Sequence, residues 1–328
     1  MVMQPSGTIS RLDLGMQIDE FDAKMDRDGF IGHRVMPIVP RSKDQGTFPK
    51  RPLEQLLQEH VTVRNANGDY PRSGSTWTTD TYQTSEHGHE ATLDDRMSKA
   101  YDDLLDAERW ESDRLEDIII RDYERAVAAA IFNATTWTGA PLTTAVTNEW
   151  DDATNAVPIT DVDAARELIV SGFGAEPNAL IINRFVFRNL RNVAQIIDRV
   201  KYQGFFNVVP GKITAQMLAD VFDLEFVLVA GGLTNTANEA AARSISRIWS
   251  NEYAMLAKVA TTSNPGESAL GRTIMWAEEG ATDGERMGVI AEQYREDQRR
   301  GDAIRKRTDY QIKVLFSAAG HLLSNITT

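Results

Sequence analysis

The sequence predicts an α+β protein in which strand-forming segments near both ends flank a helical and α/β centre. Residues 93–132 place apolar side chains at spacings of three and four, which is the period of a helix. Residues 161–230 alternate helical segments with short apolar strand segments, and three strand-like stretches follow residue 271. Because the strand-rich stretches lie far apart in the sequence, we expect the chain ends to share one domain while the centre forms another.

The composition is that of a folded protein of 328 residues, long enough for about two domains. The chain has no cysteine, which excludes disulfides, thiolate metal sites and a cysteine nucleophile. No apolar stretch approaches the roughly 20 residues that span a bilayer, and no signal segment is evident, so we expect a soluble protein made inside the cell. The net charge of −13 argues against tight phosphate binding by the bulk surface.

The first ninety residues are predicted to form an arm, an edge strand and a polar ribbon. Residues 1–30 show no sustained period and are expected to be an arm. Ile31–Pro40 is an apolar run closed by two prolines, which is typical of an extended edge strand. Residues 41–90 contain only five Leu, Ile, Val or Met residues, yet Glu59–Arg64 and Ser75–Thr84 carry strand-forming patterns. This ribbon has little to bury, so we expect it to become ordered against a neighbouring subunit; a floppy exposed loop is the alternative.

The helical period from Leu93 to about Phe132 predicts a rod of about 40 residues, roughly 60 Å long. The apolar spacing slips near Arg109–Asp113, where we expect a break. Thr92 and Asp95 are placed as a variant of the capping box at the start of this helix. The pattern has no heptad repeat, which excludes a coiled coil.

The centre and the C-terminal part continue as alternating elements after a connecting loop or short strand at 142–160. Asp161 is the expected N-cap of a helix, and Gly172–Gly174 the turn that ends it. The expected elements, in order, are helix Val162–Ser171, strand Asn178–Ile182, helices Arg184–Tyr202 and Ile213–Phe222, strand Glu225–Ala230, strand-like material at 244–260, and strands Arg272–Trp276, Met287–Tyr294 and Ala303–Phe316.

The sequence contains no constellation that predicts catalysis. Residues 24–35 and 210–214 lack the ligands and hydroxyls of an EF-hand and a phosphate loop. His87, His89 and Glu90 could close on zinc, but a polar loop end before the helix is the favoured interpretation. We therefore predict no catalytic, cofactor-binding or metal site and no enzyme activity. A metal-dependent hydrolase centred on those three residues is the enzyme alternative.

One local positive cluster interrupts the acidic chain. Three carboxylates, those of Glu296, Asp297 and Asp302, lie among the cations of this cluster and weaken its positive electrostatic potential. We favour salt bridges to acidic neighbours such as the charged segment 94–124, and nucleic-acid contact is the alternative. The cluster consists of Arg295, Arg299, Arg300, Arg305, Lys306 and Arg307.

The order and spacing of several segments carry a family resemblance. These segments are Val39–Pro40, Glu90–Arg96, Ala128–Asn133, Asp161–Gly174, Pro177–Asn183, Ile196–Tyr202, Ile248–Trp249 and Thr273–Trp276. Over essentially the whole chain they resemble the major capsid proteins of tailed bacteriophages, most specifically around residues 172–202. The resemblance rests on order and spacing rather than on one diagnostic motif.

The resemblance implies the Hong Kong 97-type fold. Residues 1–30 would be the N-terminal arm and 31–92 the extended loop with its flanking strand. Residues 93–160 would form the peripheral domain with its spine helix, 161–271 the axial domain, and 272–328 a return to the peripheral domain. Some family members crosslink a loop lysine to an asparagine of the next subunit. Lys50 lies in the loop here, but no partner asparagine or catalytic carboxylate aligns residue by residue, so the sequence leaves the presence of a crosslink open.

The function implied by the resemblance is structural. Many copies would assemble into the pentamers and hexamers of an icosahedral shell that encloses double-stranded DNA without sequence-specific binding. The shell would assemble in the host cytoplasm and become the virion, with portal, scaffolding and decoration proteins as further partners. An encapsulin-like nanocompartment around a protein cargo is the alternative. A tail or decoration protein is disfavoured, because such proteins rarely need both a long helix and an α/β centre.

Overall fold

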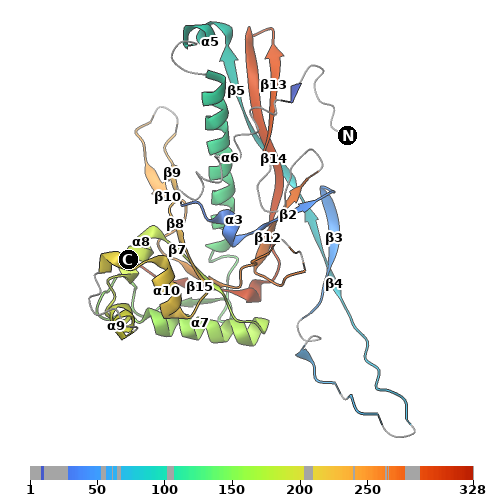
Figure 1. The fold of residues 1–328 in the computed structure, drawn as a ribbon, viewed down its shortest axis with the longest axis vertical. Helices are drawn as coiled ribbons and strands as arrows, with labels where there is room; N and C mark the ends of the chain where they lie inside the picture. The colour runs from blue at the N-terminus through green and yellow to red at the C-terminus, as the bar shows by residue number, and fades with distance from the viewer. Residues whose placement is uncertain are drawn as a thin grey trace.

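The computed structural model describes residues 9–10, 29–52, 57–60, 62–64, 68–101, 107–202, 210–238, 241–262, 264, 266–277 and 289–327. Most of the expected arm, residues 1–30, lies outside the described residues. Figure 1 shows long strands beside a long helix, a second α/β body at one end of them, and a ribbon that projects away from both. In the described part of the chain, no helix is both long and apolar enough to cross a bilayer.

The first sheet is built around one long strand, β14 (Gly301–Val314), which pairs antiparallel with β5 (Ser85–Asp94), β12 (Gly271–Trp276) and β13 (Ile290–Glu296). The strand β1 (Ile9–Ser10) pairs with β13. The three strands predicted after residue 271 are thereby confirmed.

The apolar run Ile31–Pro40 forms a strand only in its second half. The strand β2 (Ile38–Arg41) lies at the sheet edge, parallel to β12, as the prolines predict. Gly32–Val35 is instead a short helix, α3. The backbone N–H groups of Ile31 and Gly32 donate to the carboxylate of Glu124, which draws this stretch into a turn.

The ribbon consists of β3 (Gln45–Lys50) and β4 (Thr78–Gln83), paired antiparallel. This confirms the predicted strand within Ser75–Thr84. The predicted strand at Glu59–Arg64 is wrong, because the described residues of that stretch form no strand. Their side chains are exposed and have no partner strand, and an alternating pattern does not make a strand without one.

The predicted rod is two helices, α5 (Asp95–Tyr101) and α6 (Ala107–Ile131). The break expected at Arg109–Asp113 is wrong, because this segment lies inside α6; residues 102–106, between the two helices, lie outside the described residues. The capping box is wrong, since Thr92 lies in β5 opposite Ala303. The helix α6 packs on β14 and β5 through a buried apolar face. That face includes Leu115, Ile119, Ile120, Tyr123, Val127 and Ile131.

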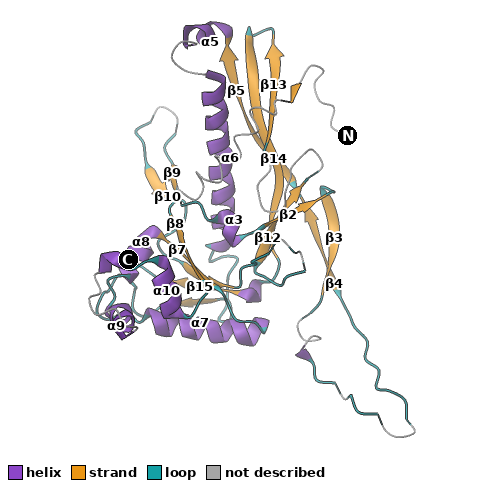
Figure 2. Ribbon diagram, viewed as in Figure 1, coloured by secondary structure: helices purple, strands orange, loops and turns teal. Residues whose placement is uncertain are grey.

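The second sheet has the order β6-β15-β11-β7-β8. Its strands are β6 (Thr143–Ala145), β7 (Ala179–Asn183), β8 (Phe226–Ala230), β11 (Ala254–Ala257) and β15 (Gly320–Ser324). Figure 2 shows the helices around it. They are α7 (Pro158–Phe173), α8 (Arg184–Leu190), α9 (Ala194–Tyr202) and α10 (Ala215–Phe222), with short 3-10 turns at Pro210–Lys212 and Ser317–Ala319. A hairpin of β9 (Leu233–Asn235) and β10 (Ile245–Arg247) leaves this body.

The details of this body correct two expectations and confirm a third. The helix α7 begins at Pro158, so Asp161 is not its N-cap; the Asp161 carboxylate accepts a hydrogen bond of 2.9 Å from the Trp150 indole. The expected helix 184–202 is two helices, α8 and α9. The turn predicted at Gly172–Gly174 is confirmed as the end of α7, where Gly174 adopts a φ of 75°.

Sheet membership also differs from the expected domain bounds at two places. The expected return of residues 272–328 to the first sheet holds for β12, β13 and β14. The last strand, β15, pairs with β11 of the second sheet instead. The strand β6, expected on the peripheral side, pairs with β15.

Candidate assembly interface

The segment between β3 and β4, residues 51–77, is the projecting part of the longer loop expected from the sequence. From here on, the name extended loop refers to residues 51–77 alone. It projects from the body of the molecule (Figure 1), and it forms no strand in its described parts. Nine large apolar side chains are exposed in the described chain, and four of them lie in this one segment. They are Leu57, Val63, Tyr70 and Trp77, each 63–76% exposed. Apolar side chains gathered on a projecting segment mark a surface that another protein covers.

The two aromatic residues of the extended loop were missed by counting aliphatic side chains. Tyr70 and Trp77 each expose about two thirds of their surface (68% and 67%). The Arg64 guanidinium lies over the Tyr70 ring, 5.0 Å from its centroid, and its Nε donates to the Gly68 carbonyl at 2.7 Å. Aromatic side chains bury large areas at interfaces, and their presence in a stretch poor in aliphatics was the available signal.

The root of the extended loop is held by a charge cluster of its own chain. The Asp80 carboxylate lies 2.7 Å from the Lys50 ammonium and 2.9 Å from that of Lys313 on β14. Lys50 also donates to the Leu315 carbonyl at 2.6 Å. Partial burial acts to raise the pKa of Asp80, but hydrogen bonds from Lys313 and Lys50 outweigh it and lower the pKa to about 2. Lys50 is therefore an anchoring residue of the ribbon.

His87, His89 and Glu90 lie on strand β5, so the interpretation as a loop end is wrong. The His87 ring stacks on Tyr310 with centroids 4.3 Å apart, and its Nδ1 lies 3.6 Å from the Asp122 carboxylate. Glu90 points to the other face of the strand and accepts a 2.9 Å hydrogen bond from the Tyr294 hydroxyl. Among the residues that the structure describes, no three potential metal ligands gather at one point.

The positive cluster makes salt bridges to acidic neighbours, as predicted. Lys306 pairs with Glu116 of α6 in a buried contact. Arg295 binds Asp95 bidentately, with one contact of 2.6 Å. Arg305 and Arg307 both bind Glu292, which lies on β13 outside the predicted acidic segment. Burial would raise the pKa of Glu292, but these two arginines lower it. These cations are neutralised within the chain, which weakens the nucleic-acid alternative.

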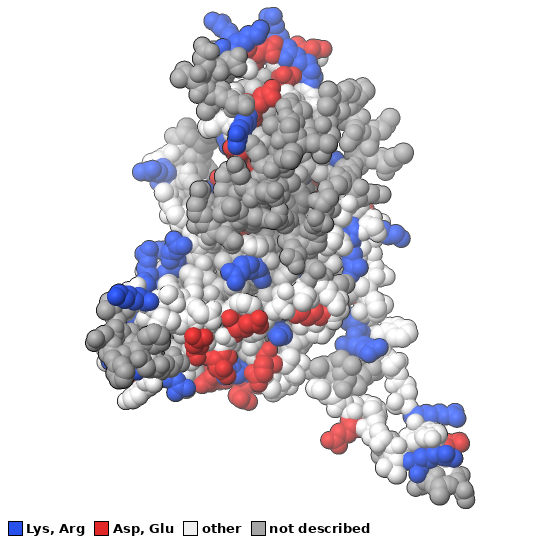
Figure 3. All heavy atoms as spheres, viewed as in Figure 1, with Lys and Arg blue, Asp and Glu red and all other residues white. Residues whose placement is uncertain are grey.

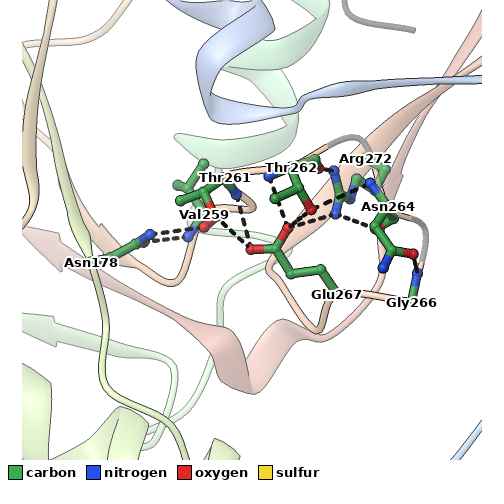
Figure 4. A network of polar contacts seen from close by, with 8 residues as sticks. All are labelled: Asn178, Val259, Thr261, Thr262, Asn264, Gly266, Glu267 and Arg272. Atoms are coloured by element: carbon green, nitrogen blue, oxygen red, sulfur yellow. Dashed lines mark hydrogen bonds and ion pairs between the residues drawn. The ribbon is translucent and has the colours of Figure 1, made fainter.

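A polar network joins the two sheets (Figure 4). The Glu267 carboxylate accepts backbone N–H bonds from Thr261 and Thr262 at 3.0 and 2.9 Å. Arg272 of β12 lies 3.3 Å from the Glu267 carboxylate and donates to the Asn264 carbonyl at 2.8 Å. Burial acts to raise the pKa of Glu267, but the hydrogen bonds lower it to about 2. The network ties the segment after β11 to the first sheet, so the body that carries the extended loop is one connected unit.

No protein-family profile matches the chain. Among curated proteins it is similar to the major capsid protein of Burkholderia phage BcepMu, with 23% identity over 201 residues. The match covers 61% of this chain and 63% of that protein, which is less than two thirds of the relative's length.

Solved structures match over nearly the whole chain. A phage-related protein from Bordetella bronchiseptica RB50 superposes with a TM-score of 0.70 at 18% identity, covering 98% of this chain and 99% of the other. The capsid of cyanophage P-SCSP1u gives 0.58 at 10% identity, covering 99% and 90%. The SrpI encapsulin of Synechococcus elongatus PCC 7942 gives 0.50 at 13% identity, covering 89% and 86%. The chain has the Hong Kong 97-type fold found in phage capsid structures such as that of the cyanophage.

Proposed function

We propose that many copies of this chain assemble into a closed icosahedral shell made of pentamers and hexamers. One observation carries the proposal: the extended loop leaves its own body and exposes Tyr70 and Trp77 there, so only another molecule can cover them. The shared fold supports it, as does the similarity to a protein named major capsid protein.

Each part of the chain is given a role in the shell that follows from its position in the fold. We propose that the first sheet with α5 and α6 forms the peripheral domain, with residues 93–160 and most of 272–328. Residues 161–271 would form the axial domain, and residues 1–30 the arm. A copy held by arm, extended loop and axial domain at once leaves the shell only when all contacts release together. No single contact then needs high affinity.

The contents that we propose are double-stranded DNA, packaged in a virion that assembles in the host cytoplasm with portal, scaffolding and decoration proteins as partners. A chain with a net charge of −13 does not hold phosphate tightly over its bulk surface, which favours filling and release of the polymer. The similarity to an encapsulin supports a second candidate function, a nanocompartment shell around a protein cargo. Purified particles decide between the two, because they contain either DNA or a cargo protein.

The experiment compares the intact chain with a variant in which Asn-Gly replaces residues 51–77. Lys50 and Thr78 are paired in the ribbon, so a two-residue turn closes the hairpin and leaves the Asp80 cluster in place. We expect closed shells from the intact chain in negative-stain micrographs. The variant should stay soluble and folded by circular dichroism, and should form no shells. Normal particles from the variant would show that the extended loop is dispensable and that the proposal is wrong.

A further inference from the structure

A hollow lined by arginines lies between α8 and the β9–β10 hairpin, on the other side of the molecule from the extended loop (Figure 1). Arg184 and Arg188 occupy positions i and i+4 of α8 and therefore lie on one helix face. Arg247 of β10 completes the set, with its guanidinium 5.1 Å from the centroid of the Phe185 ring. We name this surface the arginine hollow.

The arginine hollow has no counter-charge of its own. Within the described part of the chain, no carboxylate lies within ion-pair distance of Arg184, Arg188 or Arg247. Elsewhere the chain neutralises arginines, as at Glu292 and Asp95. Three guanidinium groups gathered without a carboxylate, in a chain of net charge −13, favour an anionic partner.

Apolar side chains beside the arginines favour a protein partner over a phosphate. Leu233 lies directly across the hairpin from Arg247 and is 47% exposed; Ile245 lies on the same face and is 61% exposed. The hairpin is fixed in place because Arg121 of α6 donates to the Leu233 carbonyl at 2.7 Å. Arginine next to exposed aliphatic groups is the composition of a protein–protein contact.

A surface of opposite charge lies on α7 and α10, which pack against each other. Its single cation, Arg166, is already engaged by Asp163, 3.4 Å away, and by the Phe222 carbonyl. Figure 3 shows acidic side chains gathered on the lower face of the molecule, where these helices lie. We name this surface the acidic face, and its exposed carboxylates belong to Asp163, Glu167, Glu176, Asp220, Asp223 and Glu225.

We propose that the arginine hollow of one copy receives the acidic face of the next copy. The inference rests on the proposed function and names the surfaces through which copies meet in a ring. Two different patches on one chain make a head-to-tail contact, and such contacts close into rings when the rotation allows. In Figure 1, α7 and α10 lie in the α/β body below α8, so the acidic face and the arginine hollow are different surfaces of one body.

The experiment uses charge reversal on each surface separately. R184E/R188E makes the hollow negative, and E167K/D220K makes the acidic face positive. Each variant alone then sets like charges against each other, and we expect its particle yield to fall at least about tenfold, equivalent to about 1.4 kcal/mol. When the two variants are mixed, every contact between unlike copies is again between opposite charges. The mixture should associate clearly more than either variant alone, but short of the unmodified chain's yield, because a ring of five copies cannot alternate two variants and keeps one contact between like charges.

The matched control is R184K/R188K, which keeps the charge and should assemble with the unmodified chain's yield. Association is measured by light scattering as well as by micrographs. If the unmodified chain forms shells but the mixture stays unassociated, the inference falls and the proposed function stands. If the mixed variants associate although no chain forms shells, the contact stands and the proposed function falls. If R184E/R188E forms normal shells and has only lost binding to a short double-stranded DNA, the hollow is a phosphate site and the inference is wrong.

Discussion

At the scale of single residues, one buried carboxylate joins three distant parts of the chain. Glu124 of α6 accepts hydrogen bonds from the N–H groups of Ile31 and Gly32 at 3.0 and 2.7 Å, and from the Trp249 indole at 2.7 Å. Burial raises the pKa of Glu124, although these three donors act in the opposite direction. The contact fixes α3 against the long helix, and it explains why an expected strand became a turn.

Gly32 is required by that contact. A Cβ at this position would lie 2.6 Å from Glu124 Oε2, a group that its three hydrogen bonds hold in place. We expect Gly32→Ala to lower the free energy of unfolding of dissociated subunits by about 1–3 kcal/mol in urea titrations. Gly172→Ala, in α7, is the matched control, because its nearest neighbour would be 3.8 Å away and an alanine favours the helix. Equal stability of the two variants would contradict the requirement for glycine at position 32.

The ion pair of Lys306 and Glu116 gives a second prediction at this scale, because both side chains are almost completely buried (2% and 6% exposed). Lys306→Met leaves the carboxylate without its counter-charge, and we expect a loss of about 3–5 kcal/mol in the free energy of unfolding. Lys306→Met/Glu116→Leu removes both charges and should be clearly more stable than the single variant. A double variant no better than the single one would show that the pair is not the source of the loss.

At the scale of elements, the ion pairs of Asp80 hold the ribbon β3–β4 against the body, and the extended loop projects beyond it. Asp80→Asn removes the charge that binds Lys50 and Lys313, and we expect about 1 kcal/mol of lost stability and faster amide exchange in β3 and β4. The pKa of Asp80 is about 2 in the folded chain, below its ordinary value of 3.8. The contribution is therefore complete above pH 4 and is lost as the pH falls towards 2. Protection factors in the intact ribbon, which correct for the intrinsic pH dependence of amide exchange, that stay unchanged down to pH 2 would contradict this.

The elements that the sequence predicted are those whose signal is local. The strands β7, β8 and β11 carry short apolar runs, and the helices between them keep their period, whereas the last strand of the second sheet, β15, was not predicted. The strand β5 is different, because Ser85–Asp94 is mostly polar and becomes a strand only through its pairing with β14. The turn at Gly32 likewise depends on a partner far away in the sequence, the carboxylate of Glu124. Composition predicted a ribbon poor in aliphatic side chains, and the structure adds the exposed aromatic side chains of its projecting part.

At the scale of the whole molecule, charged side chains are distributed unevenly over the surface, and some are paired within the chain while others are not. The basic residues near the C-terminus are neutralised inside the chain, where they join β13, β14 and the helices. Among the other charged residues, three arginines gather at the arginine hollow and six carboxylates at the acidic face, while the extended loop exposes aromatic groups. Contacts between copies therefore combine a charge-based pair of surfaces with an apolar one. Salt should weaken the first by screening and leave the second largely unaffected.

The last prediction compares the two kinds of contact within the extended loop. Full burial of an aromatic side chain of about 200 Å² is worth about 5 kcal/mol at 25 cal/mol per Å², whereas an exposed ion pair is worth about 1 kcal/mol or less. We therefore expect Tyr70→Ser/Trp77→Ser to abolish closed shells in micrographs at every salt concentration, while Arg51→Gln/Arg72→Gln lowers their yield only modestly. Trp110→Ser, which removes an indole 53% exposed on α6, controls for the loss of a surface tryptophan. If the arginine variant were the more damaging of the two, charge would dominate the loop contact and the role given to its aromatic side chains would be wrong.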